Sequence, residues 1–183
     1  MDETAILRAM ARITHEIIER NQGAQNVCIL GVKRRGVPLS KQLADNIKRF
    51  EGVSVPLGYI DARKYRDDIS ISDKSKIIED SFIPCSLENK IVILVDDVLY
   101  TGRTARAAIE AVFSLARPKM LQLAVLIDRG HRELPIRPDF VCKNVPTSKN
   151  ETISVLTKEL DGETAVYIDQ ITWYCKMHTK WLF

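Results

Sequence analysis

Apolar residues recur at helical spacing near the start of the chain, at Ile6, Leu7, Met10, Ile13, Ile17 and Ile18. The pattern stops near Gly23 and predicts a first helix. Residues 26–31 then predict a short buried strand, and a loop leads to Gly36. A second helix follows, with Pro38 in its first turn and Phe50 near its end. The chain therefore opens with one helix and one strand–loop–helix unit.

An unbroken apolar run over residues 91–95 predicts a central strand that is buried on both faces. A polar segment and another helix come next; in this helix Arg106 and Glu110 form an i,i+4 pair, and Pro118 closes it. Residues 121–127 predict a further buried strand. Shorter strands are predicted over residues 53–60, 140–143, 153–157 and 165–168, and a polar loop over residues 63–75.

The alternation of strands and helices indicates a single α/β domain with a mainly parallel sheet flanked by helices. Ligands of such domains bind at the carboxyl ends of the strands. Polar clusters at residues 31–36, 96–104 and 128–130 each follow a predicted strand. We therefore expect them to meet at one edge of the sheet.

Composition narrows the class of protein without indicating a partner. The 183 residues are 45% hydrophobic and 28% charged, which is typical of one globular domain, and a net charge of +3 is too mild to predict an anionic partner. The apolar runs are shorter than the roughly 20 residues that span a bilayer, and the acidic start predicts no signal peptide. Four scattered cysteines predict neither a disulfide framework nor a zinc site, and favour the reduced cytoplasm.

Residues 96–104 are the strongest candidate for chemistry. Asp96 and Asp97 end a buried strand, where two carboxylates are costly unless they bind hydroxyls, a cation or positive side chains. The turn from Thr101 to Thr104 leads into a helix, whose free N–H groups and hydroxyls suit a phosphate monoester. The segment therefore predicts a sugar-phosphate site. The alternative is an ordinary strand-to-helix turn in which Thr104 only caps the helix.

The loop after the first strand carries three cations, Lys33, Arg34 and Arg35. By itself such a run is more often a solvated charged face. Its position between a strand and a helix N-terminus instead favours binding of a multiply charged anion. The chain has neither a P-loop nor a dinucleotide-binding glycine motif.

The segment IVILVDDVLYTGRT, residues 91–104, resembles the phosphoribosyl pyrophosphate (PRPP) motif of type I phosphoribosyltransferases. More narrowly, the chain resembles the PyrR family of pyrimidine-operon regulators, which also have uracil phosphoribosyltransferase activity. The resemblance runs from Leu7 to Ile168 and includes residues 12–16, 65–68 and 128–137, with an extension over 143–148. It implies a type I phosphoribosyltransferase fold with a small hood region and a flexible active-site loop.

The resemblance implies a role for each part of the motif. Asp96 and Asp97 would hold the ribose hydroxyls of PRPP, and Arg35 would join them as a catalytic residue. The PRPP-binding residues would be Lys33, Arg34, Arg35 and Gly36 of the pyrophosphate loop (residues 31–36), together with Asp96, Asp97, Val98, Leu99, Tyr100, Thr101, Gly102, Arg103 and Thr104 of the PRPP motif (residues 96–104). Uracil would displace pyrophosphate to give UMP, with Mg²⁺ bound mainly through PRPP and pyrophosphate rather than by dedicated protein ligands.

Two further regions are implied around the substrates. Tyr65, Arg66, Asp67 and Asp68, here called the flap, would form the flexible loop that closes over PRPP. Asp128, Arg129, Lys143 and Asn144 would line the uracil pocket. Tyr100 stands where phosphoribosyltransferases for 6-oxopurines usually have Asp, which favours a pyrimidine. The chain departs from the usual PyrR pattern at Arg34, Arg63, Lys64, Pro138 and Cys142.

The resemblance also implies binding of a structured RNA, such as the leader of a pyrimidine-operon transcript, under the control of UMP or UTP. The candidate RNA-binding residues are Arg12, His15, His131, Arg132, Arg137 and Lys143. Judged from the residues alone, a solvated helix face is the better explanation for Arg12 and His15, and a hydrogen-bonded turn for His131. The alternative function is a pyrimidine salvage enzyme without an RNA role.

The resemblance further implies a homodimer or larger homo-oligomer without a membrane partner. It places the phosphoribosyltransferase domain at residues 1–168 and leaves a tail at residues 169–183. This tail holds both tryptophans and matches nothing in the family pattern. Its sequence is compatible with an added strand, an interaction tail or a non-native extension.

Overall fold

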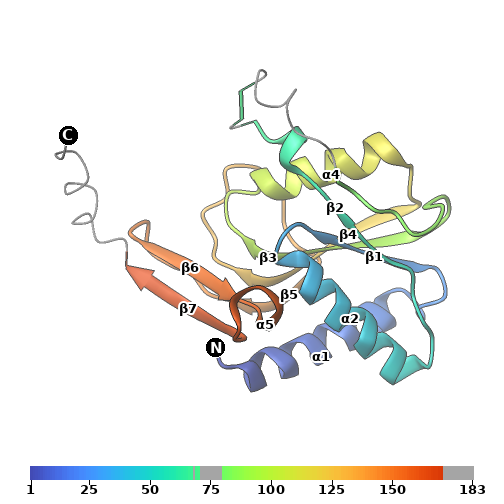
Figure 1. Cartoon of the computed structure of the whole chain (residues 1–183), viewed down its shortest axis with the longest axis horizontal. Helices are drawn as coiled ribbons and strands as arrows, with labels where there is room; N and C mark the ends of the chain where they lie inside the picture. The colour runs from blue at the N-terminus through green and yellow to red at the C-terminus, as the bar shows by residue number, and fades with distance from the viewer. Residues whose placement is uncertain (68, 71–79, 171–183) are drawn as a thin grey trace.

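The fold is built on a five-stranded sheet in which every pairing is parallel (Figure 1). A computed structural model describes residues 1–67, 69, 70 and 80–170. The strand order is β2-β1-β3-β4-β5. The strands are β1 (Val27–Val32), β2 (Leu57–Ile60), β3 (Ile91–Leu99), β4 (Met120–Asp128) and β5 (Phe140–Asn144). Because β3 lies in the middle of the sheet, both of its edges are paired with other strands.

Helices cover the two faces of the sheet unequally. Helices α1 (Glu3–Arg20) and α2 (Gly36–Glu51) lie together on one face, and α4 (Arg103–Leu115) lies on the other (Figure 1). The side chain of Asp2 caps α1 by accepting a hydrogen bond of 2.7 Å from the backbone N–H of Ala5. A short 3₁₀ turn, η1 (Arg63–Tyr65), follows β2.

Alternate residues of β3 enter two separate cores. Ile93 and Val95 face the core shared with α1 and α2, whereas Val92 and Leu94 face the core shared with α4. A strand buried on both sides needs apolar residues at every position, which is why its sequence shows an unbroken run. The prediction of a central parallel strand is confirmed.

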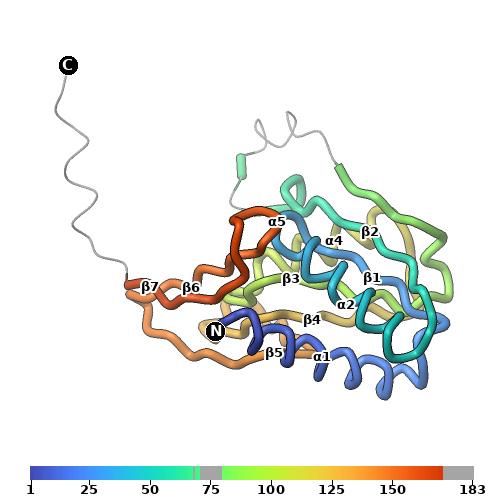
Figure 2. The backbone as a smooth tube through the Cα atoms, turned by 60° about the horizontal axis from the view of Figure 1, so that its bottom comes forward, coloured from blue at the N-terminus to red at the C-terminus, as the bar shows by residue number. Residues whose placement is uncertain are grey.

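A small antiparallel unit stands at one end of the sheet (Figure 2). This hood consists of β6 (Glu151–Leu156), α5 (Lys158–Asp161) and β7 (Ala165–Gln170). The chain start is fastened to it, because Met1 and Val166 exchange hydrogen bonds of 2.6 and 2.9 Å. Arg129 also donates to the Glu151 carbonyl at 2.7 Å, so β4 is joined to β6.

The elements predicted from periodicity are present, with shifted ends. The strand predicted over residues 53–60 begins only at Leu57, because Pro56 has no N–H and offers only its carbonyl, to Ile29 at 2.9 Å. Strand β3 continues past the apolar run to Leu99, and β7 continues to Gln170. Within the described residues no helix is long and apolar enough to cross a membrane.

The core beneath α2 provides a test of the packing. Leu43 is fully buried between α2 and the sheet, so we expect Leu43→Ala to lower the free energy of unfolding by about 2–5 kcal/mol. Leu7, which is 48% exposed on α1, is the matched control, and Leu7→Ala should cost less than about 1 kcal/mol. Urea denaturation measures both; equal losses would contradict this packing.

Candidate functional site

The pyrophosphate loop and the PRPP motif meet at the carboxyl edge of the sheet, where β1 and β3 end side by side. Gly36 begins α2 directly against β3. A Cβ at this position would lie 2.3 Å from the Val95 carbonyl oxygen and 3.4 Å from the Asp96 Cα. Only glycine permits so close an approach of two backbones. The structure therefore brings these two predicted clusters together.

Asp96 and Asp97 lie in the second half of β3 rather than beyond its end. Asp96 is 7% exposed and accepts a hydrogen bond of 2.9 Å from the Asp97 N–H; Asp97 accepts one of the same length from the Val98 N–H. Burial, and then the neighbouring Asp97 carboxylate, raise the pKa of Asp96 well above its usual range. Ribose hydroxyls are neutral hydrogen-bonding partners for such a pair.

The turn after β3 leaves a helix N-terminus open. Gly102 adopts a φ of 92° and is the N-cap of α4, and no side chain caps this helix. The alternative in which Thr104 caps the helix is therefore wrong, because Thr104 already lies inside it. The Arg103 N–H contacts the Thr101 hydroxyl at 3.3 Å. Backbone N–H groups at such an end favour an anion.

The three cations of the pyrophosphate loop point to different partners. The Lys33 ammonium forms an ion pair with Asp80, and the Arg35 guanidinium contacts the Asp161 carboxylate of α5 at 3.0 Å. The Nε atom of Arg35 is buried and lacks a hydrogen-bond partner within the described residues. Arg34 is exposed, and the Lys33–Arg34 peptide bond is cis. A buried donor without a partner can be satisfied by a bound anion.

The base of the flap is fastened to α4. Arg106 donates to the Tyr65 carbonyl at 2.7 Å, and the Tyr65 hydroxyl lies 2.6 Å from the hydroxyl of Ser114. Arg103 forms ion pairs with Asp67 and with Glu133. The Arg103 guanidinium is thus engaged by two carboxylates, and its backbone N–H contacts the Thr101 hydroxyl. Asp68 lies outside the described residues.

The predicted uracil region forms where β4 and β5 end as neighbours. Asp128 pairs with Asn144 in the register of the sheet, and Lys143 precedes Asn144 at an exposed position. Arg129 is 7% exposed, and its guanidinium carbon lies 4.0 Å from the centre of the Tyr100 ring. The structure thus brings these four residues together beside the PRPP motif.

The comparisons with known proteins agree with this geometry. Residues 2–161 match the Phosphoribosyl transferase domain family. Bifunctional protein PyrR of Acetivibrio thermocellus is 57% identical over 171 residues, which cover 93% of each chain. That of Caldicellulosiruptor bescii is 53% identical over 171 residues, covering 93% of this chain and 94% of the relative. The chain belongs to the PyrR family of phosphoribosyltransferases.

Solved structures of hypoxanthine phosphoribosyltransferases share the type I phosphoribosyltransferase fold. A hypoxanthine phosphoribosyltransferase of Trypanosoma cruzi superposes with a TM-score of 0.71 at 19% identity, covering 93% of this chain and 94% of that one. A hypoxanthine-guanine phosphoribosyltransferase of Bacillus anthracis gives a TM-score of 0.61 at 20% identity and 79% coverage of each chain. At these identities the likeness concerns the fold alone.

Two of the candidate RNA residues, Arg12 and His15, lie on α1 and contact other elements of the fold. Arg12 donates to the carbonyls of Val141 and Cys142 at 2.7 and 2.8 Å and so ties α1 to β5. The His15 ring stacks on Phe50, with 4.2 Å between the ring centres. These contacts give both side chains a use in packing that helical spacing alone did not indicate.

The other candidate RNA residues differ in how strongly they are held. Arg132 donates to the carbonyls of Tyr100 and Ile136, each at 2.9 Å, and to the Asp128 carboxylate at 2.5 Å. His131 adopts a φ of 56° and places Nε2 2.5 Å from the Thr147 carbonyl oxygen, as expected of a hydrogen-bonded turn. Arg137 is exposed beside a cavity of about 310 Å³.

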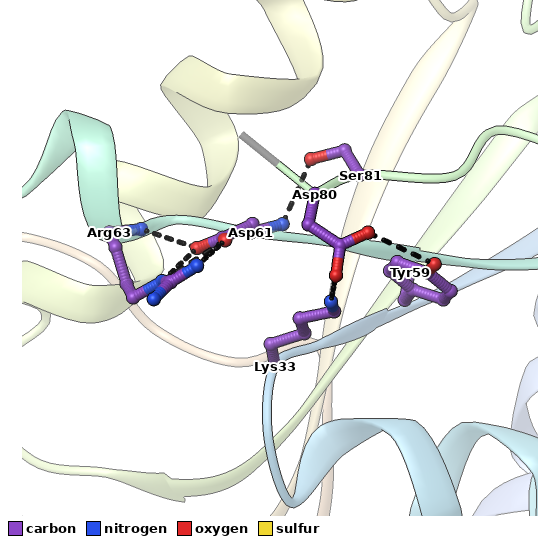
Figure 3. Close-up of polar contacts among 6 residues, drawn as sticks. All are labelled: Lys33, Tyr59, Asp61, Arg63, Asp80 and Ser81. Atoms are coloured by element: carbon purple, nitrogen blue, oxygen red, sulfur yellow. Dashed lines mark hydrogen bonds and ion pairs between the residues drawn. The ribbon is translucent and has the colours of Figure 1, made fainter. Parts of the chain in front are cut away.

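Sequence reasoning missed an ion pair at the end of β2 between a buried aspartate and an exposed arginine. Asp61 is 1% exposed, and the Arg63 guanidinium donates Nε to its two oxygens at 2.9 and 3.0 Å (Figure 3). Arg63 is singled out in the sequence only as a departure from the family pattern. Its aspartate partner two residues earlier was the available signal. The departure thus supplies the counter-charge of a buried carboxylate.

Within residues 1–67, 69, 70 and 80–170, no group of three or more His, Cys, Asp or Glu side chains is placed to hold a metal ion. Oxygen atoms of a phosphorylated substrate are the ligands that Mg²⁺ prefers. Asp96 and Asp97 add carboxylate oxygens at the same edge of the sheet.

The Asp61–Arg63 pair predicts a pH-dependent stability. Burial opposes ionisation of Asp61, but hydrogen bonds from Arg63 hold its pKa below the usual value. Its stabilisation is therefore complete above the unfolded-state pKa and is lost as pH falls through the folded-state pKa. Urea unfolding should show wild type more stable than Asp61→Asn at pH 7, and the difference should shrink in acid. A difference that is independent of pH would contradict this assignment.

Proposed function

We propose that the chain transfers the phosphoribosyl group of PRPP to uracil, and that with a uridine nucleotide bound it recognises a structured leader RNA and regulates pyrimidine biosynthesis genes. The contact of Gly36 with the Val95 carbonyl carries the proposal, because it joins an anion-binding loop to a diol-binding carboxylate pair. Relatives named Bifunctional protein PyrR support the combination of two activities. A salvage enzyme without an RNA role is the competing function.

The proposal gives each group one part of PRPP to bind. Asp96 and Asp97 accept hydrogen bonds from the ribose hydroxyls, and the N-terminus of α4 with its Thr101–Thr104 turn holds the 5'-phosphate. The buried Nε of Arg35 donates to pyrophosphate. These contacts fix the sugar by both ends, which leaves C1 facing the incoming base.

The reaction forms a bond between a uracil nitrogen and C1 while the bond from C1 to pyrophosphate breaks. The electron pair of that bond leaves with pyrophosphate, and the attacking nitrogen loses its proton. Positive charge develops at C1 beside the Asp96–Asp97 pair, and negative charge develops near Arg35. Catalysis therefore rests on positioning and electrostatic stabilisation rather than on a covalent nucleophile.

Asp96 and Asp97 are the carboxylates that would hold magnesium beside the phosphorylated substrate. The ion would supply positive charge that stabilises the departing pyrophosphate. The residues of the chain contribute the remainder through Arg35 and the backbone of the pyrophosphate loop.

Tyr100 and Arg129 favour a pyrimidine over a purine. The Tyr100 ring packs on the Arg129 guanidinium at 4.0 Å and meets the His131 ring edge-on at 6.1 Å. Position 100 thus lacks the aspartate that phosphoribosyltransferases for 6-oxopurines usually carry there. Lys143 and Asn144, at the end of β5, supply polar groups for the uracil edge.

Exposed cations beside the same pocket support the RNA role. Lys143 is exposed near the end of β5, and Arg137, exposed before β5 begins, lines a cavity together with Asp128. A nucleotide bound there can alter the surface that RNA meets, since the two sites share the Asp128–Asn144 neighbourhood. We also expect a homodimer or larger homo-oligomer, acting in the cytoplasm where transcripts form.

The enzymatic half of the proposal predicts UMP formation from uracil and PRPP that depends on magnesium. Asp97→Ala should lower kcat/KM by about 10² or more, because a transition-state contact is lost. The exposed Asp45 of α2 gives the control, and Asp45→Ala should leave the rate unchanged. Radiolabelled uracil measures the product. Efficient turnover of hypoxanthine would contradict the pyrimidine assignment at Tyr100.

The regulatory half predicts tighter RNA binding when UMP or UTP is present. Arg137→Gln should weaken binding of a pyrimidine-operon leader RNA and preserve UMP synthesis. It should also lower the slope of log K against log salt concentration by about one unit in magnitude. Arg117→Gln, an exposed change beyond α4, is the control of equal charge. Gel-shift titrations at several salt concentrations measure both. Equal affinity with and without nucleotide would favour the salvage function.

A further inference from the structure

Lys33 belongs to the pyrophosphate loop, but its side chain lies over the opposite side of β1 from the PRPP motif. Strand β1 stands between β2 and β3 in the sheet. The Lys33 ammonium is 4.5 Å from the centre of the Tyr59 ring on β2, toward which it points (Figure 3). Asp96 and Asp97 lie on β3. The ammonium is therefore directed away from the carboxylates that would hold the ribose.

The Lys33 ammonium contacts two groups, which also contact each other. Its partners are the Asp80 carboxylate and the face of the Tyr59 ring, and the Tyr59 hydroxyl donates to Asp80 Oδ1 at 3.3 Å (Figure 3). The hydrogen bond and charge of Lys33 hold the pKa of Asp80 below its usual value, so the carboxylate is ionised at neutral pH. A cation over an aromatic face gains further attraction.

Backbone hydrogen bonds hold the Asp80 segment beside Tyr59 at the edge of the sheet. Tyr59 and Phe82 exchange two backbone hydrogen bonds of 3.0 and 2.9 Å, and the Asp61 N–H donates to the Ser81 hydroxyl at 3.0 Å. The Lys33 N–H itself donates to the Ile60 carbonyl at 3.0 Å. The segment that carries Asp80 is thus docked on β2, and the ammonium has a fixed anchor.

We propose that Lys33 is a positioning residue, and that Asp80 and Tyr59 anchor its ammonium so that the pyrophosphate loop keeps the shape that pyrophosphate needs. The inference rests on the proposed function. Lys33 precedes Arg34 and Arg35, so fixing its side chain limits the freedom of the peptide groups that follow it. Pyrophosphate then meets a loop that is already ordered, and less binding energy is lost on ordering it.

This role differs from that of a direct ligand in a measurable way. If Lys33 bound pyrophosphate itself, removing the competing Asp80 carboxylate would leave PRPP binding unchanged or strengthen it. If Lys33 positions the loop through Asp80, loss of either partner weakens PRPP binding. Loss of both then costs no more than the larger single loss, because the two changes break one interaction.

The test compares Asp80→Asn, Lys33→Met and the double variant with wild type, using Asp45→Asn as the control of equal charge. Each single change should raise KM for PRPP about three- to tenfold, the scale of one lost polar contact, with kcat within about twofold. KM for uracil should not change. Calorimetric binding of magnesium pyrophosphate should weaken by the same factor, and the double variant should match the worse single variant.

Specific outcomes would overturn the proposal. An unchanged or lower KM for PRPP in Asp80→Asn would show that the carboxylate does not anchor Lys33 for binding. A double variant whose effect is the product of the two single effects would show independent roles. If wild type forms no UMP, the proposed function fails, and pyrophosphate binding alone then decides whether Lys33 and Asp80 act together.

Discussion

The site depends on a contact between two backbones, that of Gly36 at the start of α2 and that of Val95 in β3. A Cβ on Gly36 would lie 2.3 Å from the Val95 carbonyl oxygen, a distance at which one of the two segments must move. Val95 is followed by the two carboxylates, and Gly36 is preceded by the three cations. Because Gly36 has no side chain, the two carboxylates and the three cations can lie at the same edge of the sheet.

Around this contact, three polar features of the described residues are available to a ligand. Burial and the neighbouring Asp97 raise the pKa of Asp96, and the buried Arg35 Nε lacks a hydrogen-bond partner among the described residues. The N-terminus of α4 has no side-chain cap. In the proposed function, the ribose hydroxyls, the pyrophosphate and the 5'-phosphate of PRPP would satisfy these three features in turn. Departures from local consistency are expected at functional sites.

Periodicity and local composition predicted the elements well because burial dictates them directly. The unbroken run in β3 follows from its two cores, and the helical spacing in α1 follows from the face that carries Ile6, Met10 and Ile13. Exact strand ends depend on details such as the missing N–H of Pro56, which spacing does not report. The PRPP motif was predictable because its chemistry lies in nine consecutive residues.

Contacts between distant segments were beyond sequence reasoning. Arg12 donates to carbonyls about 130 positions later in the chain, and Lys33 contacts Asp80, which lies 47 positions later. The sequence around a cation does not show whether its side chain faces solvent, RNA or a carbonyl group. The helical spacing of Arg12 and His15 therefore did not reveal their packing partners. The Arg63 departure acquired a reason only when the buried Asp61 beside it became visible.

The central claim is that the ends of β1 and β3 form one site that spans both halves of PRPP. Competition calorimetry with magnesium tests it most directly. The account predicts that PRPP binds once per chain, that UMP and pyrophosphate each displace it, and that UMP and pyrophosphate bind together without excluding one another. Simultaneous binding of PRPP and UMP, or PRPP binding that pyrophosphate does not affect, would contradict the claim.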